Sequence, residues 1–384
     1  MKIAINLLQL TPGRPEGVVT YVRELLSNIG DFTENDRIYV LVQQGLELPS
    51  LNEKSIEIVP FGRKKEEGLK PSLYFDRLKR KLSLSKNNPS LSELIEKRGI
   101  QLIHYPFSII PELDQKLSIP IILSVMDLQH EYFPDLFTSE DLLARQKNFY
   151  TSTQRADHII AISEYTKESL VKKLTISESK IEVIYLAGNL SKTPDTSIVL
   201  PKNFMYYPAG DWPHKNHQNL FRAMAYLRKK ERFVPQLILS GLQNESKLMH
   251  QKFVDELGIS DEVTHLGQVS YDQVAGIYKR ATMLIYPSLF EGFGIPLLEA
   301  MTANIPIACS NRSSIPEVTA SAACYFNPEN PESIARAIEK VWHNKSYRDV
   351  LIARGKIQVN NFSWRACASD TYNSYKRVLK VNRG

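Results

Sequence analysis

The sequence predicts an α/β protein with two domains, each a doubly wound parallel sheet. Short apolar runs alternate with helical patterns along both halves of the chain, and a turn-rich segment without periodicity, residues 188–202, separates the halves. Strands that alternate with helices form parallel sheets covered on both faces. The 384 residues are long for one core and comfortable for two. We therefore expect domains at residues 1–187 and 203–362.

The first half begins with a strand at Lys2–Leu7, a loop ending near Gly17, and a helix with apolar positions at helical spacing from Val18 to Ile29. A single Gly17 is weaker than the dinucleotide fingerprint, so no NAD site is predicted. Further strands are expected at Ile38–Val42, Ile56–Val59, Ile100–His104, Ile119–Val125, His158–Ile162 and Ile181–Leu186. Further helices are expected at Ser90–Lys97, Ser139–Asp157 and, capped by Ser163, Glu164–Leu174.

The second half repeats the alternation of strands and helices. Its strands are expected at Phe204–Tyr207, Leu237–Ser240, Val263–Leu266, Met283–Tyr286, Ile307–Cys309 and Cys324–Phe326. Its helices are expected at Gln218–Arg228, Glu245–Leu257, Tyr271–Arg280, Glu332–Trp342, Tyr347–Asn360 and Trp364–Leu379, with one more opened by Pro296. Ligands of such sheets bind at the carboxyl ends of the strands, so we expect the site in the cleft between the domains.

Composition is that of an ordinary soluble globular protein, with 43% hydrophobic and 23% charged residues. Cys309, Cys324 and Cys367 have no paired spacing and no neighbouring histidine cluster, which indicates a reducing compartment and no structural metal site. The apolar part of the N-terminus is too short for a signal peptide. No apolar run approaches the roughly 18 residues of a membrane span. These features predict a cytoplasmic protein.

The basic residues gather in one segment. Between residues 61 and 86, nine Lys and Arg accompany three acidic residues, so this segment carries an excess equal to the whole formal net charge of +6. Apolar side chains at near-helical spacing accompany them. Docking on an anionic membrane or lipid-linked acceptor is one interpretation, and a solvated basic face packed on its own domain is the other. A nucleic-acid partner is not expected, because repeated base-stacking side chains do not accompany the charges.

The stretch from Tyr286 to Met301 carries the most chemistry. A buried strand ends in a turn with Gly292 and Gly294 and feeds a helix that has proline at its start. The glycines permit close approach of a ligand, and free N–H groups at the helix start attract an anion such as phosphate. Glu291 in the turn and Glu299 in the helix are expected to face different parts of one ligand. Taken alone, the two carboxylates are also compatible with a helix-dipole partner and a solvated charge.

Two other loops follow strands of the same predicted sheet. Trp212–His217 places Lys215 before a helix, where an ammonium and free N–H groups together suit a diphosphate. Ser310–Val318 offers hydroxyls, amides and a carboxylate. Each loop alone is also compatible with a simple helix-entry cap. Because all three loops leave one edge of one sheet, they predict a shared site.

In combination, these motifs resemble the retaining glycosyltransferases of the GT-B fold, specifically glycosyltransferase family 4. The Glu291–Glu299 stretch is similar to the Glu-x7-Glu signature of that family, and the loops Trp212–His217 and Ser314–Val318 match in order. In the first half, Asp127–Pro134 and Ala161–Leu170 are similar to acceptor-side loops of sugar transferases that build bacterial polysaccharides. The resemblance covers the chain essentially end to end.

The resemblance implies two Rossmann-like domains facing across a cleft, the first for the acceptor and the second for a nucleotide sugar, with residues 363–384 packing back on the first. It implies that Glu291 approaches the donor sugar, Glu299 binds the ribose hydroxyls and Lys215 neutralises the diphosphate. The expected catalytic residues are Glu291, Asp127 and Lys215. The expected donor-binding residues are Gly17, His214, Arg312, Phe293, Gly294, Ile295, Leu298 and Glu299, and the acceptor-side residues are His130 and Ser163. No metal or cofactor is implied, because Lys215 and helix N–H groups can neutralise the leaving diphosphate.

Three positions depart from the family pattern. Met126 stands where many relatives have a histidine, Gly210 where relatives often have an arginine, and Gly17-Val18 where they have two glycines. His130 is close to Met126 in sequence, but nothing in the sequence shows that it substitutes for the missing histidine. We hypothesise that Met126 forms an apolar floor suited to a 6-deoxy or otherwise less polar sugar.

The expected reaction is metal-independent glycosyl transfer with retention, from a nucleotide-diphospho-sugar to a saccharide or lipid-linked saccharide acceptor of a cell-surface polysaccharide. The expected enzyme is cytoplasmic and peripheral at the inner face of the membrane. The resemblance favours mannose from GDP-mannose, and UDP-glucose, UDP-N-acetylhexosamine and deoxysugar donors stay open. An inverting GT-B enzyme or an epimerase is disfavoured by the two glutamates. A catalytically silent scaffold that binds a nucleotide sugar stays open because of Met126.

Overall fold

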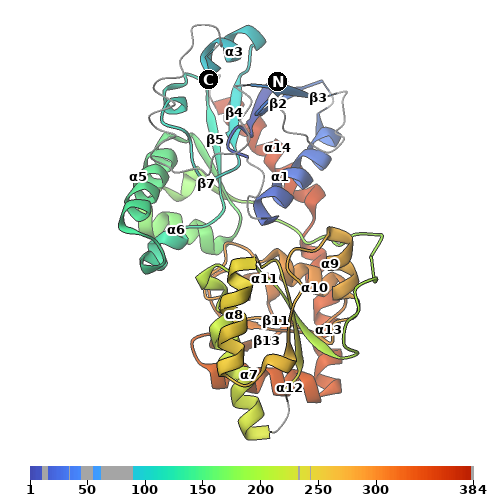
Figure 1. The fold of residues 1–384 in the computed structure, drawn as a ribbon. Helices are drawn as coiled ribbons and strands as arrows, with labels where there is room; N and C mark the ends of the chain where they lie inside the picture. The colour runs from blue at the N-terminus through green and yellow to red at the C-terminus, as the bar shows by residue number, and fades with distance from the viewer. Residues whose placement is uncertain are drawn as a thin grey trace.

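The computed structural model describes residues 1–10, 16–33, 35–44, 55–61, 90–231, 234–242 and 244–381. Apart from Phe61, the basic segment at residues 61–86 lies outside the described residues, so its predicted membrane contact stays a prediction. The described chain forms two domains, one above the other in Figure 1, each with helices around a central sheet.

Both sheets are parallel throughout, as the alternation of strands and helices predicted. The first has seven strands in the order β3-β2-β1-β4-β5-β6-β7, and the second has six in the order β10-β9-β8-β11-β12-β13. The first sheet consists of β1 Lys2–Asn6, β2 Arg37–Val42, β3 Ile56–Pro60, β4 Leu102–Tyr105, β5 Ile121–Val125, β6 His158–Ala161 and β7 Ile181–Val183. The second consists of β8 Phe204–Pro208, β9 Gln236–Ser240, β10 Val263–His265, β11 Met283–Tyr286, β12 Ile307–Ser310 and β13 Ala323–Phe326. The strand order reverses beside β1 and beside β8, which is where ligands of doubly wound sheets bind.

Helices cover both faces of each sheet (Figure 1). In the first half they are α1 Glu16–Ile29, α3 Leu91–Arg98, α4 Gln129–Tyr132, α5 Ser139–Arg155 and α6 Glu164–Leu174. In the second half they are α7 His217–Glu231, α8 Asn244–Glu256, α9 Tyr271–Tyr278, α10 Ile295–Thr302, α11 Ile315–Thr319, α12 Pro331–His343, α13 Lys345–Gln358 and α14 Trp364–Val381. The sequence did not predict α4 and α11, because four or five residues are too few to show helical periodicity.

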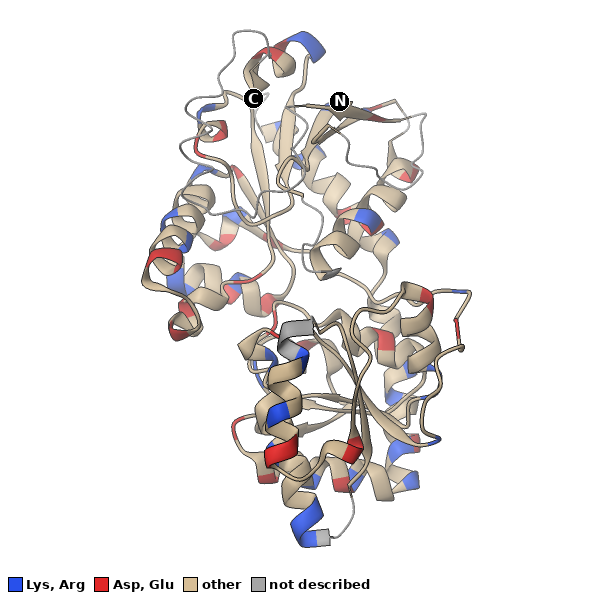
Figure 2. Cartoon of the chain, viewed as in Figure 1, with Lys and Arg blue, Asp and Glu red and all other residues tan. Residues whose placement is uncertain are grey.

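The strands are buried because helices cover the sheets. All residues of β4, β5, β11 and β12 are buried, as expected for parallel strands enclosed on both faces. Charged side chains lie mainly on the helices and their ends, whereas the sheets are mostly uncharged (Figure 2). The hydrophobic effect of this burial fixes the strands, so the loops at their carboxyl ends start from rigid positions.

The last helix, α14, packs on the first domain although it follows the second in sequence. It lies against α1 (Figure 1). The Tyr375 hydroxyl lies 2.7 Å from His104 Nδ1, and His104 Nε2 lies 2.7 Å from Ser124 Oγ, which also contacts the Tyr21 hydroxyl at 2.9 Å. Burial lowers the pKa of His104 to about 3 and keeps this ring neutral. This buried network joins α14 to β4, β5 and α1.

The segment after β7 lies on α9 and α10 of the second domain. Asn189 O accepts a hydrogen bond from the Tyr271 hydroxyl at 2.7 Å, and Asp195 N–H donates to Asp272 O at 2.9 Å. A Cβ at Gly188 would lie 2.4 Å from Leu298 Cβ, so only glycine fits at this contact. These contacts fix where the chain enters β8.

Candidate functional site

The turn after β11 has the backbone that the glycines predicted. Gly294 is the N-cap of α10 and has φ +107°, in the left-handed region, where a side chain is disfavoured. A Cβ there would also lie 2.8 Å from Leu297 Cδ1. Ser314 Oγ, at the start of α11, lies 2.9 Å from Glu291 O and 3.0 Å from Phe293 O, so its one hydroxyl hydrogen is shared between the two carbonyls. The turn from Glu291 to Phe293 is therefore bonded to the start of α11 at both of its ends.

Lys215 and Glu291 form an ion pair at the centre of the site. Lys215 Nζ lies 2.7 Å from Glu291 Oε1, and the two side chains are only 17% and 11% exposed. Lys215 ends a short turn after β8, followed by Asn216 with φ +61°. The Asn216 amide donates to Pro287 O at 3.0 Å and to Pro328 O at 2.8 Å. Asn216 therefore binds the Lys215 loop to the neighbouring loops after β11 and β13.

The charges around Glu291 keep its carboxylate ionised. Burial alone would raise the pKa of Glu291, but the Lys215 ammonium and the hydrogen bonds from Lys215 and Ser288 bring that pKa below its ordinary value. Burial, with the Lys215 charge, lowers the pKa of His214 to about 4, so this imidazole is neutral at pH 7. His214 Nδ1 is buried and has no hydrogen-bond partner among the described residues.

Asp127 of the first domain lies beside this ion pair. A Cβ at Gly292 would lie 2.0 Å from Met126 O and 3.1 Å from Asp127 Cβ, so the two domains touch through backbone at this point. Asp127 Oδ1 accepts a hydrogen bond from Gln129 N–H at 2.9 Å. Burial raises the pKa of Asp127, and the nearby Glu291 charge adds to the rise. The structure thus brings Asp127, Lys215 and Glu291 together from three loops.

The remaining residues of the Glu-x7-Glu stretch have different surroundings. Glu299 Oε2 accepts a hydrogen bond from the buried Tyr278 hydroxyl at 3.0 Å. Leu298 is fully buried, and Phe293 packs against Tyr185 and Phe362 with ring centroids 6.1 and 5.7 Å apart. The side chains of Leu298 and Phe293 therefore belong to the core, and only their backbone can face a ligand.

Two family models cover nearly the whole chain. Residues 15–192 match the model described as Glycosyltransferase Family 4, and residues 192–358 match the model described as Glycosyl transferases group 1. The chain belongs to the family 4 glycosyltransferases. Its two facing parallel sheets are the GT-B fold of these proteins.

Among named relatives, O-antigen chain mannosyltransferase B of Escherichia coli is 28% identical over 253 residues, which cover 63% of this chain and 66% of the relative. O-antigen chain mannosyltransferase RfbU of Salmonella typhimurium is 30% identical over 224 residues, which cover 57% of this chain and 60% of the relative. The chain therefore spans less than two thirds of the length of each relative in these alignments.

Solved structures share the fold along the entire chain. Sucrose-phosphate synthase from Thermosynechococcus elongatus superposes with a TM-score of 0.76 over 99% of this chain and 100% of that one, at 19% identity. Anabaena HepE, solved with UDP and glucose, superposes with a TM-score of 0.70 over 98% of this chain and 100% of that one, at 15% identity. At these identities the likeness shows the fold alone.

Among the described contacts of this glycosyltransferase, three predicted site residues, Gly17, Arg312 and Ser163, form no hydrogen bond or ion pair with Lys215 or Glu291. Gly17 is exposed in the first turn of α1, and a Cβ there would meet nothing within 4 Å. Arg312 is exposed and pairs with Glu329 at 2.5 Å. Ser163 is fully buried as the N-cap of α6.

His130 lies in the core of the first domain. It is 1% exposed and its ring packs on Phe149, with centroids 4.4 Å apart. Burial lowers the pKa of His130 to about 4. In this structure the His130 side chain therefore presents almost no surface to an acceptor.

A hollow of about 220 Å³ opens between the two domains next to the Glu291 loop. Rings from both domains form its wall, with Phe290 lying 5.4 Å from Tyr132 and 5.8 Å from Tyr165 between centroids. The other lining residues are Phe133, Leu289, Arg312, Ser313 and Glu329. Ser313 Oγ accepts the Glu291 N–H at 2.9 Å, which places the inner end of the hollow at the Glu291 loop. The sequence did not indicate this hollow, although three of its aromatic residues, Tyr132, Phe133 and Tyr165, lie in the predicted acceptor-side loops.

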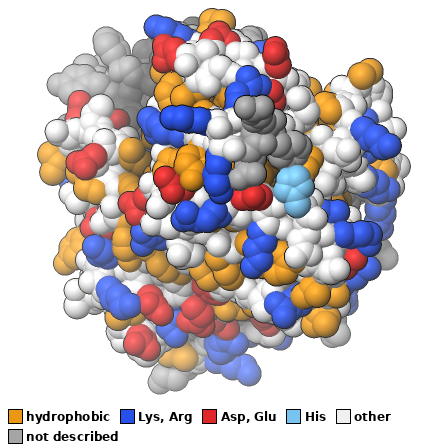
Figure 3. Space-filling view, turned by 90° about the horizontal axis from the view of Figure 1, so that it is seen from below, with side chains coloured by type: hydrophobic (Ala, Val, Ile, Leu, Met, Phe, Trp, Pro, Cys, Tyr) orange, Lys and Arg blue, Asp and Glu red, His pale blue; other side chains and the backbone are white. Residues whose placement is uncertain are grey.

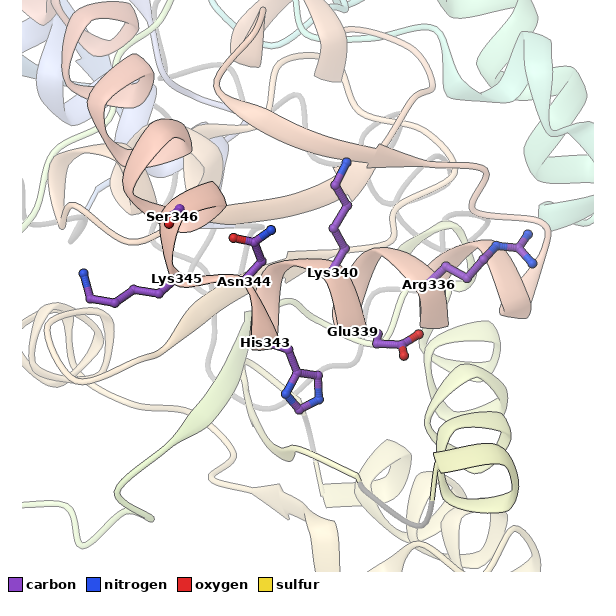
Figure 4. Close-up of a pocket in the computed structure, with 7 residues that line it drawn as sticks. All are labelled: Arg336, Glu339, Lys340, His343, Asn344, Lys345 and Ser346. Atoms are coloured by element: carbon purple, nitrogen blue, oxygen red, sulfur yellow. The ribbon is translucent and has the colours of Figure 1, made fainter.

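A second hollow, of about 660 Å³, lies on α12 and the start of α13, away from the domain contact (Figure 4). Two of its four charged side chains already have partners along the helices, since Arg336 lies 3.5 Å from Glu332 and Lys345 lies 2.8 Å from Asp349. On the end of the molecule that carries α7 and α12, basic and acidic side chains are interspersed (Figure 3). This hollow therefore lacks the convergent polar groups of a binding site.

Within the described ranges, no cluster of three or more His, Cys, Asp or Glu side chains is arranged to hold a metal ion. None of the described helices has the length and apolar character that crossing a membrane requires.

Proposed function

We propose that the protein is a retaining, metal-independent glycosyltransferase that moves a sugar from a nucleotide-diphospho-sugar to a saccharide acceptor. The observation that carries this proposal is the Lys215–Glu291 pair, buried where Asp127 of the other domain meets the catalytic loop. An ammonium, an ionised carboxylate and a second carboxyl group at the strand ends of a GT-B cleft suit a reaction that separates charge between a sugar and a diphosphate.

Lys215 has two partners in the proposed cycle. Without donor it binds Glu291. An incoming diphosphate competes for the same ammonium, and the unpaired Nδ1 of His214 provides a neutral contact nearby. Once Lys215 binds phosphate, the Glu291 carboxylate is released toward the sugar, where it stabilises positive charge at the anomeric carbon. Glu299, one turn into α10, binds the ribose.

The bond changes balance without a metal or a cofactor. The acceptor hydroxyl oxygen attacks the anomeric carbon on the face that the diphosphate leaves, so configuration is retained. The bond from that carbon to the phosphate oxygen breaks, and its electron pair stays on the diphosphate. The hydroxyl proton passes to the departing phosphate oxygen, while Lys215 balances the remaining negative charge.

For the donor we propose mannose from GDP-mannose. The support is that O-antigen relatives of this chain are named mannosyltransferases. UDP-sugars are the alternative, because the structural neighbour HepE was solved with UDP and glucose. Met126, whose backbone meets Gly292, is the residue that we expect to bias the choice toward less polar sugars.

We propose that the acceptor binds in the aromatic hollow beside Glu291. A pyranose has an apolar C–H face that packs on rings such as Tyr132, Tyr165 and Phe290, and hydroxyls that pair with Arg312 and Glu329. Its inner end at the Glu291 loop directs one acceptor hydroxyl toward the donor. A cell-surface polysaccharide or its lipid-linked precursor provides such a chain end.

The test begins with thermal shifts in GDP, UDP, GDP-mannose and UDP-glucose, because a ligand at about 100 times its Kd stabilises the native state by about 2.7 kcal/mol. The nucleotide sugar that binds is then incubated with methyl α-mannoside and short mannosides, and nucleotide release is measured. We expect release with wild type and a loss of at least about 100-fold in Glu291→Gln. Product anomers by NMR decide retention. Binding without release for any acceptor would favour the silent scaffold instead.

We further propose a cytoplasmic enzyme that docks on the inner membrane face through residues 61–86. The support is the basic excess of this segment. Flotation with anionic vesicles should recover the wild type and lose a variant with Arg77, Lys79, Arg80 and Lys81 neutralised. Equal flotation of both proteins would contradict the proposal.

A further inference from the structure

Helix α6 of the first domain is capped by a carboxylate from the second. Glu164 N–H donates to Glu317 Oε1 at 2.7 Å, and Tyr165 N–H donates to Glu317 Oε2 at 3.1 Å. These are the first two amides of α6, which have no partner inside the helix. A carboxylate at this end also interacts favourably with the helix dipole. Glu317 lies in α11, about 150 residues further along the chain.

The same helix start is bonded to the catalytic loop. Ser163, the N-cap of α6, accepts the third amide of the helix, Thr166 N–H, at 3.1 Å. Its hydroxyl lies 2.8 Å from Gly292 O and donates to that carbonyl. All three first-turn amides of α6 are therefore satisfied at the domain contact, two by Glu317 and one by a serine that holds the loop beside Glu291.

Glu317 also lies near Tyr185, at the end of the first domain. Burial and the nearby charge of the Glu317 carboxylate raise the pKa of the Tyr185 phenol. One turn earlier, Ser314 at the start of α11 binds the carbonyls of Glu291 and Phe293. Helix α11 therefore contacts the first domain through Glu317 and the catalytic loop through Ser314.

We propose that Glu317 is a positioning residue that holds the two domains closed over the Glu291 loop. It touches neither Lys215 nor Glu291, and it acts by fixing α6 and α11 relative to each other. The neighbouring packing of Phe290 on Tyr132 and Tyr165 is apolar and less directional, so Glu317 sets the register of the contact. The effect of Glu317 on the reaction rate rests on the proposed transferase activity, whereas its effect on the contact between the domains does not.

The test compares Glu317→Ala and Glu317→Gln with a matched control, Glu332→Gln. Glu332 is also a glutamate in the first turn of a helix of the second domain, but it pairs with Arg336 of its own helix. The radius of gyration of each ligand-free protein is measured by small-angle X-ray scattering. We expect a larger radius for Glu317→Ala than for wild type and no change for Glu332→Gln.

The kinetic arm uses the donor that releases nucleotide with wild type. Loss of charge-assisted hydrogen bonds changes an equilibrium constant by about 10- to 100-fold. We expect kcat/KM for the acceptor to fall by this factor in Glu317→Ala. The Kd of the free nucleotide, GDP or UDP by calorimetry, should stay within about threefold because it reports the second domain alone. Glu317→Gln keeps one acceptor oxygen and should fall between wild type and Glu317→Ala.

Two outcomes would overturn the proposal. An unchanged radius of gyration with unchanged kcat/KM would show that the contact does not set closure. A loss of nucleotide affinity as large as the loss of kcat/KM would show that Glu317 supports the fold of its own domain. If wild type transfers no sugar, the proposed function fails, and the scattering comparison still decides the role of Glu317.

Discussion

Replacing Gly292 by alanine should separate the two domains at the Glu291 loop. The new Cβ would lie 2.0 Å from Met126 O, whereas real Cβ contacts are not shorter than 3.0 Å. The loop and the carbonyl must therefore move apart by at least about 1 Å, and a misplacement of that size reduces catalytic rates about 100-fold. The backbone of Gly292 is not in the left-handed region, so alanine introduces no dihedral strain of its own.

The assay is kcat for nucleotide release together with the Kd of the nucleotide. We expect kcat to fall about 100-fold and the Kd to change by less than about threefold, because the obstruction faces the other domain. Gly210→Ala is the matched control, since its new Cβ would lie 3.6 Å or more from its neighbours. The control should keep both values near those of wild type.

A wild-type kcat in Gly292→Ala would refute the reasoning. It would mean that the contact between the Glu291 loop and Met126 is absent when the reaction occurs. A small-angle scattering measurement then shows whether the domains open in the variant. An unchanged radius of gyration would mean that the loop accommodates the new Cβ without separating the domains.

Three more results are expected. Lys215→Met should lower the free energy of unfolding in urea by about 3 kcal/mol, because it leaves Glu291 charged and buried. The double variant with Glu291→Gln should recover most of that loss. No recovery would contradict the pairing of Lys215 with Glu291. The free energy of unfolding should fall as pH drops from about 6.5 toward 4. Burial lowers the pKa of His130, His214 and His265 to about 4 in the folded protein, so over this range the unfolded chain binds more protons than the folded one. A melting temperature that stays constant over this pH range would contradict the prediction. Nucleotide release should persist in excess EDTA, and its loss would contradict a Lys215-based leaving-group role.

The part of the site that directly follows one strand, β11, could be predicted from the sequence. Glycines, a proline at the helix start and two glutamates around β11 form one local pattern, and the structure has the expected left-handed Gly294 and the helix from Ile295. Helix α6 begins and ends where its pattern predicted, because Ser163 is a local cap. The pairing of Arg312 with Glu329 could not be predicted from the sequence, because the two residues lie on different loops, and the role of Arg312 at the donor stays a prediction.

What the sequence determined by itself is the order of strands and helices, the two parallel sheets and the loops that carry Lys215 and Glu291. These features depend on periodicity and on caps that involve residues a few positions apart. Only the tertiary structure decided that His130 is buried, that rings from both domains form a hollow, and that Glu317 caps α6. Those contacts join residues that are distant in sequence or belong to different domains, and no local pattern encodes the relative placement of two separately folded cores.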